Sequence, residues 1–184
     1  MILVDWQIRK AVQGQEIIVD PFDDSLINPH SMDFRLGESI SFLKKNKLYP
    51  EIRPESKDSF NYSEINIKGT VHKPGSFTLQ PRQFCIASML ENITLASHIM
   101  ANVRGKSSLG RLGIMQSSVA GLVDGGWSGI LTIELFNYSN EEIVLTYGMK
   151  IGQLTFERTD VPTNPYGVKG RYQNQTAGMG SLGL

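Results

Sequence analysis

The sequence predicts a mainly β fold, arranged as a sandwich, a jelly roll or a small barrel, with one short helix near its N-terminus. After Pro21, short apolar or alternating runs recur, and glycine, proline, asparagine and aspartate separate them. These runs are rich in β-branched and aromatic residues, which favour strands. The 184 residues, 40% of them hydrophobic, can form one domain with one core, and we expect that domain to cover residues 1–184.

The N-terminal helix is predicted from the spacing of two apolar residues. Ile8 and Val12 lie four positions apart and would share one helix face. Asp5 is a candidate N-cap, and Gly14 stands where a helix often stops. We therefore expect a helix between these two residues.

Short strands are expected after Pro21, interrupted by one polar segment and followed by a tail. The segment Lys44–Asn66 is charge-rich and contains two prolines, so we expect a long loop or an irregular hairpin. After Thr159, prolines and glycines predict a flexible tail. The expected strands cover Ser31–Leu36, Ser39–Leu43, Ser76–Leu79, Phe84–Met89, Ile130–Phe136, Ile143–Leu145 and Ile151–Phe156.

Charge and cysteine content limit the classes of function. The 18 Lys and Arg residues balance the 18 Asp and Glu residues, which argues against a general nucleic-acid binder. The single cysteine, Cys85, lies in an apolar run and cannot form an internal disulfide, which favours a buried side chain and a reducing compartment. No signal-peptide pattern and no membrane-spanning apolar stretch is present. We expect a cytoplasmic protein with no membrane partner, in the host cytoplasm if the source is a virus.

Two common nucleotide-site chemistries are excluded by missing residues. Zinc-dependent nucleobase deaminases need a His-x-Glu run and a Pro-Cys-x-x-Cys run. The chain has one cysteine, and no glutamate stands two positions after a histidine, so zinc is not expected. The segment closest to a Walker phosphate loop, Gly105–Ser108, lacks the first glycine that this loop requires.

Two neighbouring stretches contain groups that suit a nucleotide. Val103–Gly113 combines three basic residues with serines and glycines, which suits a polyphosphate, although a basic surface loop explains the same composition. In Ser118–Gly129, four glycines surround Asp124. Glycines permit close backbone approach to a ligand, but a hairpin with a solvated aspartate at its tip would need them equally.

A third stretch, Ile130–Asn137, contains one acidic residue in an otherwise apolar strand. Strict alternation places Ile130, Thr132, Glu134 and Phe136 on one face. Glu134 must then face either water or a desolvated site. A desolvated carboxylate has a raised pKa and suits general acid–base chemistry, whereas an exposed edge strand would give it no such role.

These stretches, in this order, resemble the dCTP deaminase and dUTPase family. The resemblance covers essentially the whole chain and implies a dUTPase-like distorted β-barrel or jelly roll, whose glycine-rich C-terminal tail, about residues 160–184, closes over the site as a lid. It is based on INPHSMDFRLG (Ile27–Gly37), GKSSLGRLG (Gly105–Gly113), ILTIELFN (Ile130–Asn137), GMKIGQLTFE (Gly148–Glu157) and PYGVKGRYQNQ (Pro165–Gln175).

The resemblance also bears on the type of enzyme. AGLVD (Ala120–Asp124) and Gln153 resemble the bifunctional enzymes and the dUTPases, as does the tail AGMGSLG (Ala177–Gly183), in which Met179 replaces the usual aromatic. Glu134 resembles the deaminases, because plain dUTPases usually have an apolar residue there. We therefore favour a bifunctional dCTP deaminase–dUTPase that forms dUMP. The alternatives are a deaminase only, a dUTPase only, or a non-catalytic nucleotide-binding trimer.

For deamination, the resemblance implies that Glu134 takes a proton from the water that attacks C4 of cytosine. The carbonyl of Ala120 and the hydroxyl of Ser107 would hold that water, and Arg111 would orient Glu134. Asp124 would bind the sugar 3′-OH, and the tight segment at Val123 would exclude a 2′-OH. The remaining substrate-binding residues implied by the matching motifs are Leu109, Gly110, Thr132, Ile133 and Gln153.

For cleavage of dUTP, the resemblance implies a water that Asp124 positions near the α-phosphorus, with Mg²⁺ bound through the triphosphate. Asp33 would contact this ion through water, although an aspartate in a strand more often makes a structural hydrogen bond. Lys106 stands where the family usually has arginine. Tyr166 and Tyr172 would pack over the substrate, with core packing as the alternative for Tyr172. The candidate phosphate ligands are Lys106, Ser108, Arg171 and Gln175.

The family also implies an assembly. We expect a homotrimer with three sites at subunit interfaces, where one chain supplies the Gly105–Gly113 loop and its neighbour supplies the catalytic strand. The expected ligands are dCTP and dUTP, and dTTP is a candidate inhibitor because family members often respond to it.

Overall fold

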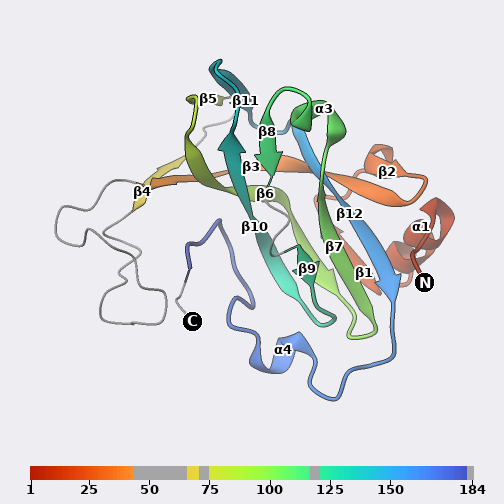
Figure 1. Cartoon of the computed structure of the whole chain (residues 1–184). Coiled ribbons are helices and arrows are strands. Elements are labelled where there is room, and N and C mark those ends of the chain that lie inside the picture. Colours follow the sequence, from red (N-terminus) through yellow and green to blue (C-terminus); the bar gives the residue numbers. More distant parts are fainter. Residues whose placement is uncertain (44–65, 71–74, 117–120, 182–184) are drawn as a thin grey trace.

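The computed structural model of the chain describes residues 1–43, 66–70, 75–116 and 121–181 (Figure 1). Strands make up most of the regular structure, and the helices are short, which confirms the predicted mainly β fold with an N-terminal helix. The elements are α1 (Asp5–Gln13), β1 (Ile17–Asp20), η1 (Asp24–Leu26), β2 (Ile27–Asn28), β3 (Ser31–Leu43), β4 (Asn66–Thr70), β5 (Ser76–Leu79), β6 (Phe84–Leu95), β7 (Ile99–Gly105), α3 (Ser107–Gly110), β8 (Ile114–Gln116), β9 (Leu122–Val123), β10 (Ser128–Asn137), β11 (Ile143–Thr146), β12 (Lys150–Arg158) and α4 (Tyr166–Lys169).

Ten of the described strands form one curled antiparallel sheet (Figure 1). Its main path runs in the order β8-β10-β6-β3-β12-β7-β9, while β1 pairs with β6, and β2 and β4 pair with β3. Strands β11 and β5 form a separate two-stranded sheet. The large sheet curls into a half-barrel, so that one of its faces encloses the core.

Strand β3 bends the sheet at Gly37. Its first half pairs with β12, and its second half pairs with β6 and β4. The register of β3 against β6 shifts between Leu36 and Ile40. A Cβ atom at Gly37 would lie 2.3 Å from the carbonyl oxygen of Met89, so only glycine allows the strands to cross this closely. The two strands expected at Ser31–Leu36 and Ser39–Leu43 are therefore one bent strand.

The N-cap of helix α1 lies one residue earlier than the sequence predicts. Its N-cap is Val4, whose backbone N–H donates to Oε1 of Gln7 at 3.0 Å, and Asp5 is the first helical residue. The preceding residues stay extended because the N–H of Leu3 donates to the carbonyl oxygen of Phe156. The prediction of Asp5 as N-cap is therefore wrong, and the prediction of a stop at Gly14, which is the C-cap, is confirmed.

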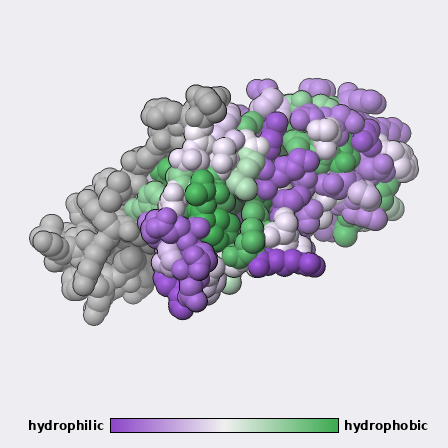
Figure 2. Space-filling view, turned by 90° about the horizontal axis from the view of Figure 1, so that it is seen from above, coloured by the Kyte–Doolittle hydropathy of each residue, from purple (hydrophilic) through white to green (hydrophobic). Residues whose placement is uncertain are grey.

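Exposed apolar side chains gather beside α3 and β8, and we call Leu112, Met115 and Tyr138 the upper apolar patch. Met115 pairs with Phe136 across β8 and β10, and the Phe136 ring lies 4.4 Å from the Tyr138 ring, centroid to centroid. Figure 2 views the molecule from this end and shows hydrophobic surface flanked by hydrophilic surface. Such a patch is typical of a surface that another protein covers.

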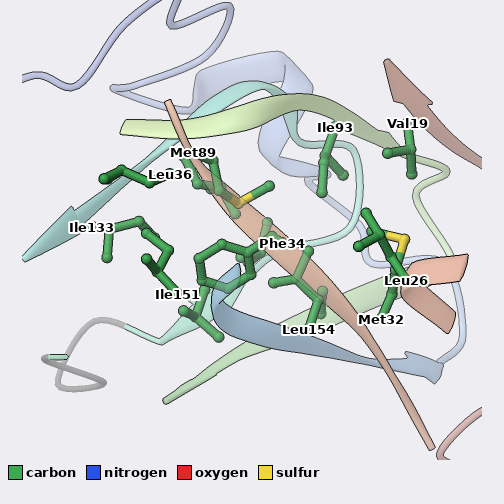
Figure 3. Close-up of a cluster of buried hydrophobic side chains, with 14 of the residues drawn as sticks. Val19, Leu26, Met32, Phe34, Leu36, Met89, Ile93, Ile133, Ile151 and Leu154 are labelled. Atoms are coloured by element: carbon green, nitrogen blue, oxygen red, sulfur yellow. The ribbon is translucent and has the colours of Figure 1, made fainter. Parts of the chain in front are cut away.

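The core lies inside the curl of the sheet, with Phe34 of β3 at its centre (Figure 3). Leu154 of β12 and Met89 of β6 pack around it, and both are fully buried. Each such side chain contributes about 1.5–3 kcal/mol to folding through removal of its apolar surface from water. Cys85 is also in this core, where burial raises the pKa of its thiol to about 12, so the thiol stays protonated and unreactive.

No helix within the described ranges is long and apolar enough to cross a membrane. The sequence predicts a loop or hairpin over Lys44–Asn66. Residues 44–65 of this segment lie outside the described residues, and Asn66 begins β4.

Candidate functional site

Strand β10 separates its side chains into two classes by alternation. Its odd-numbered residues, such as Ile133 and Leu135, are buried in the core. The even-numbered residues are half-buried on the opposite face, as expected for a strand that carries Ile130, Thr132, Glu134 and Phe136 on one side. The register places Glu134 directly opposite Ile86 of β6, and Ile86 opposite Ser41 of β3. These neighbours are almost fully buried, so the carboxylate borders a largely dry part of the face.

The surroundings of Glu134 favour its neutral form. Desolvation by burial raises the pKa of the Glu134 carboxyl above its usual value, and a hydrogen bond from its own backbone lowers it by a smaller amount. Within the described residues, no basic side chain forms an ion pair with this carboxylate. A raised pKa moves this carboxyl group toward the pH range in which general acid–base catalysis operates.

The predicted phosphate loop folds as the end of β7 followed by the single turn of α3. Lys106 is the N-cap, and the N–H of Arg111 closes the turn by donating to the carbonyl oxygen of Ser107 at 3.0 Å. Leu109 is buried and anchors this turn to the protein. The hydroxyls of Ser107 and Ser108 and the guanidinium of Arg111 therefore lie on the exposed side, beside Gly110.

Lys106 reaches from this turn to a buried carboxylate on β3. Its Nζ lies 2.7 Å from Oδ1 of Asp33, a residue with only 3% of its surface exposed. Nζ of Lys150, at the start of β12, lies 3.3 Å from Oδ2 of the same carboxylate. Gln153 stands opposite Asp33 in the β12–β3 pair, and its Oε1 accepts a hydrogen bond from the Ser31 hydroxyl.

Asp124 lies exposed at the turn between β9 and β10, next to the buried Val123. The two glycines that follow receive the C-terminal tail. The carbonyl oxygen of Gly125 accepts from the N–H of Tyr166 at 3.0 Å, and that of Gly126 accepts from Nε2 of Gln173 at 3.1 Å. Gly126 has a φ of 90°, which glycine adopts without strain.

The tail then turns back and runs beside β10 of its own chain (Figure 1). Gln175 is buried there: its carbonyl oxygen accepts from the N–H of Ile130, and its Nε2 donates to the Thr132 hydroxyl at 2.6 Å. The N–H of Met179 also donates to that hydroxyl, at 3.0 Å. Thr132 thus joins the tail to the strand two residues before Glu134.

Sequence comparison identifies the family to which this architecture belongs. A family model described as "dCTP deaminase-like" matches residues 2–159.

The chain belongs to the dCTP deaminase-like family.

Similar family members come from several bacteria. A protein of Corynebacterium glutamicum (strain R) named "dCTP deaminase, dUMP-forming" is 38% identical over 179 residues, covering 95% of this chain and 92% of the relative. A protein of Mycolicibacterium vanbaalenii with the same name is 40% identical over 179 residues, with 95% and 92% coverage. Among solved structures, a 2′-deoxycytidine 5′-triphosphate deaminase from Agrobacterium tumefaciens has the same fold, with a TM-score of 0.65 and 21% identity. The match covers 85% of this chain and about half, 48%, of that longer chain.

The structure of this dCTP deaminase-like chain brings together some of the predicted site residues. Thr132 and Glu134 lie on one face of β10, Thr132 contacts Gln175, and Lys106 contacts Asp33. Arg111 and Glu134 form no ion pair within the described part of the chain, and Ala120 lies outside the described residues. The side chains of Ile133, Leu109 and Val123 are buried, so a ligand could reach these residues only through their main chain.

The predicted tail residues Tyr166, Tyr172 and Arg171 differ in their surroundings. The ring of Tyr166 packs on Trp127 at 5.4 Å between centroids, and Tyr172 is half-buried against the core, which agrees with the core-packing alternative for Tyr172. Arg171 has its side chain exposed. The sequence does not predict Lys150 as a site residue, although it stands within the matching segment Gly148–Glu157. Its position becomes informative only through its contact with Asp33 in the folded chain.

The donor set around Asp33 bears on the expected Mg²⁺. No group of three or more His, Cys, Asp or Glu side chains suitable for a metal occurs among the residues that the structure describes. Two ammonium groups flank Asp33, and their charge opposes direct binding of a cation. The residues therefore fit an ion that is held by phosphate oxygens rather than by the protein.

Proposed function

We propose that this chain is a bifunctional enzyme that deaminates dCTP to dUTP and cleaves dUTP to dUMP and diphosphate. The relatives named "dCTP deaminase, dUMP-forming" match it over nearly their whole length, which supports this activity. The observation that carries the deaminase step is the single carboxylate of Glu134, half-buried on a strand face with a raised pKa. Its products would enter pyrimidine deoxynucleotide metabolism as dUMP.

In the deamination step, Glu134 would take a proton from water, and the resulting hydroxide would attack C4 of cytosine. The same carboxyl group would then carry protons to N3 and to the leaving ammonia. The carbonyl of Ala120 and the Ser107 hydroxyl would hold the water, and Arg111 would orient Glu134 and stabilise the negative charge of the tetrahedral intermediate. The desolvated position of Glu134 supports its role as the proton carrier. A carboxyl group with a raised pKa is better suited both to accept a proton from water and to donate it afterwards.

In the cleavage step, Asp124 would bind the sugar 3′-OH and position a water in line with the α-phosphorus. Lys106, Ser108, Arg171 and Gln175 would bind phosphate oxygens. Mg²⁺, when bound through the triphosphate, would offset negative charge that develops in the transition state. The exposure of Asp124 beside the docked tail supports its access to such a substrate.

A homotrimer would complete the site. Arg111 lies exposed and forms no ion pair with Glu134 within the described part of its own chain, so we infer that a neighbouring chain supplies the arginine. The upper apolar patch, adjacent to α3, supports an interface at this place. Substrates would then bind between subunits, with the tail, about residues 160–184, as a lid.

One time course separates this proposal from the alternatives. Purified chain is incubated with dCTP and Mg²⁺, and dCTP, dUTP and dUMP are resolved as the reaction proceeds. We expect dUMP to form with little free dUTP. Lasting accumulation of dUTP would leave a deaminase only, conversion of added dUTP without conversion of dCTP would leave a dUTPase only, and no turnover of either nucleotide would leave a non-catalytic trimer.

Three further expectations accompany this function. The chain would form a single domain over residues 1–184 and would act in the cytoplasm, where its nucleotide substrates are made. dTTP, which resembles dCTP and dUTP in its sugar and phosphates, would inhibit by occupying the same site. Added dTTP should therefore lower the rate of dUMP formation in the same time course.

A further inference from the structure

We propose that Lys150 is a second phosphate-binding residue and that Asp33 is a positioning residue that holds Lys150 and Lys106 together as a paired cationic site. This inference rests on the proposed function in one respect only, namely that the anion bound here is a triphosphate.

The geometry of the cluster provides the first argument. Nζ of Lys106 lies 2.7 Å from Oδ1 of Asp33, and Nζ of Lys150 lies 3.3 Å from Oδ2, so one carboxylate binds two ammonium groups from different elements. Lys106 caps α3 and Lys150 begins β12, two segments that are far apart in the sequence. The carboxylate thus fixes the distance between the two ammonium groups.

The exposure of the three side chains provides the second argument. Asp33 has 4% of its side chain exposed, whereas Lys106 and Lys150 have 24% and 46% exposed. A buried carboxylate is stable only when it is paired, which explains why both of its oxygens have a cationic partner. Both lysine side chains remain partly exposed, so an anionic ligand can reach them.

The number of hydrogen-bond donors provides the third argument. An ammonium group has three N–H donors. Lys106 uses one of them in its hydrogen bond to Asp33, whereas Lys150 forms an ion pair with Asp33. At least two donors on each lysine therefore remain for other acceptors without loss of the ion pairs. Two lysines and one aspartate leave a net charge of +1, so the cluster attracts a phosphate chain while the buried carboxylate remains neutralised.

The register of the neighbouring strands extends this basic surface. Gln153 stands opposite both Asp33 of β3 and Arg104 of β7, so these three residues form a row across one face of the sheet. Arg104 is exposed and adds a third basic group close to Lys106. A polyanion that is longer than one phosphate fits this arrangement better than a single phosphate does.

The test is calorimetric titration of the full-length chain with inorganic tripolyphosphate at low ionic strength. A charge-assisted hydrogen bond contributes enough free energy that Lys150→Met should weaken binding about tenfold. Lys150→Arg, which keeps the charge, should retain most of the affinity. Lys10→Met, which removes an exposed lysine from α1, is the matched control and should bind as the parent does. Unchanged affinity in Lys150→Met, or an equal loss in Lys10→Met, would overturn the proposal.

Asp33→Asn tests the positioning role against a contact with a metal ion. Asp33→Asn adds one unit of positive charge to the cluster but releases both ammonium groups from their fixed positions. If Asp33 holds the two lysines, the lost positioning should outweigh the added charge, and this variant should lose affinity equally with Mg²⁺ and with a chelator. A loss confined to Mg²⁺ would instead place Asp33 in the hydration shell of the ion and overturn its positioning role. Thermal unfolding establishes that each variant is folded.

The same probe separates this inference from the proposed function, because tripolyphosphate has neither base nor sugar. A chain that binds it through Lys150 but forms no dUMP would retain the paired site and lose the proposed activity. A chain that forms dUMP with an unchanged KM for dCTP in Lys150→Met would retain the activity and lose the paired site.

Discussion

Glu134 derives its chemical properties from its neighbours rather than from its residue type. The face that it shares with Ile86 and Ser41 is largely shielded from water, and no cation within the described residues compensates its charge. An exposed glutamate on an edge strand would have an ordinary pKa and would remain ionised at neutral pH. Desolvation therefore gives the Glu134 carboxyl a pKa above its usual value.

Replacement of Glu134 by Gln should abolish release of ammonia from dCTP. The amide keeps the size of the side chain but cannot accept and return the proton, and loss of a general acid–base group typically costs about 10²–10⁴ in rate. The measurement is an ammonia assay with dCTP and Mg²⁺, and Glu142→Gln, at an exposed position directly before β11, is the control. Ammonia release near the parent rate would exclude this role for Glu134.

The same substitution should change how stability depends on pH. Because the folded state raises the pKa of Glu134, the folded chain binds this proton more tightly than the unfolded chain does. The parent should therefore lose stability as pH rises from the ordinary carboxyl pKa through the raised folded value. Glu134→Gln lacks this loss, so it should exceed the parent in stability above that window and lose its advantage below it.

Urea unfolding at a series of pH values measures this difference. Glu142→Gln should run parallel to the parent, because its carboxylate is exposed. A Glu134→Gln curve parallel to the parent would show that burial does not disfavour the charged form.

Gln116 is a second residue whose neighbours determine its energetic contribution. Both polar atoms of its side chain are buried, and neither has a hydrogen-bond partner among the described residues. Gln116→Met should therefore raise the free energy of unfolding by about 1 kcal/mol, since an unsatisfied amide costs about 1–3 kcal/mol. Gln13→Met on the exposed face of α1 is the control for a general effect of methionine. Lower stability in Gln116→Met would mean that the amide finds partners in solution.

At the scale of the elements, Thr132 connects the tail to β10. Its hydroxyl accepts from Nε2 of Gln175 and from the N–H of Met179. Thr132→Val removes these two hydrogen bonds, and also the longer one from the hydroxyl to the carbonyl oxygen of Met179 at 3.5 Å, while keeping the shape of the side chain. Loss of two bonds of about 1 kcal/mol each should accelerate amide exchange of Met179 about thirtyfold.

Hydrogen exchange resolved along the tail measures this change. Thr146→Val, an exposed threonine on β11, should leave tail exchange unchanged. Equal exchange in Thr132→Val and in the parent would show that the other contacts of the tail hold it without this hydroxyl.

Local patterns in the sequence predict features that depend on the order of residues within one segment. Alternation along Ile130–Phe136 predicted both β10 and the shared face of Thr132 and Glu134, because each strand residue alternates whatever its partner is. The sequence does not predict strand β7, because Arg104 and the following Gly105 resemble a basic loop. Pairing with β12 stabilises this segment, and no local pattern encodes that pairing.

The same distinction applies to the site. The expected flexible tail is docked on β10 by hydrogen bonds between residues that are far apart in the sequence, as Gln175 and Thr132 are. Glycine and proline content predicts the absence of a helix or strand there but not this docking. The Lys150–Asp33 contact is equally non-local, so only the folded chain brings the second lysine to the carboxylate.

At the scale of the whole molecule, oligomerisation should depend on the upper apolar patch. We expect a mass near three times the 20.5 kDa of one chain. Met115→Glu places a charge in the patch and should lower the mass toward that of one chain, because burying an unpaired carboxylate is unfavourable. Light scattering measures this shift, and Val161→Glu, an exposed apolar residue after β12, is the control. A parent mass near 20.5 kDa would contradict the trimer.

The tail docks on β10 of its own chain, and this determines which pairs of inactive variants could restore activity together in a mixed oligomer. In such an oligomer, each site takes Glu134 and the tail from the same chain. When a chain truncated before Pro165 is mixed with a Glu134→Gln chain, no site therefore has both an intact Glu134 and a tail. A chain with Arg111→Ala is different, because its intact Glu134 can meet the intact arginine of a Glu134→Gln partner. Co-expression of two inactive alleles should therefore recover activity in the second pairing and not in the first.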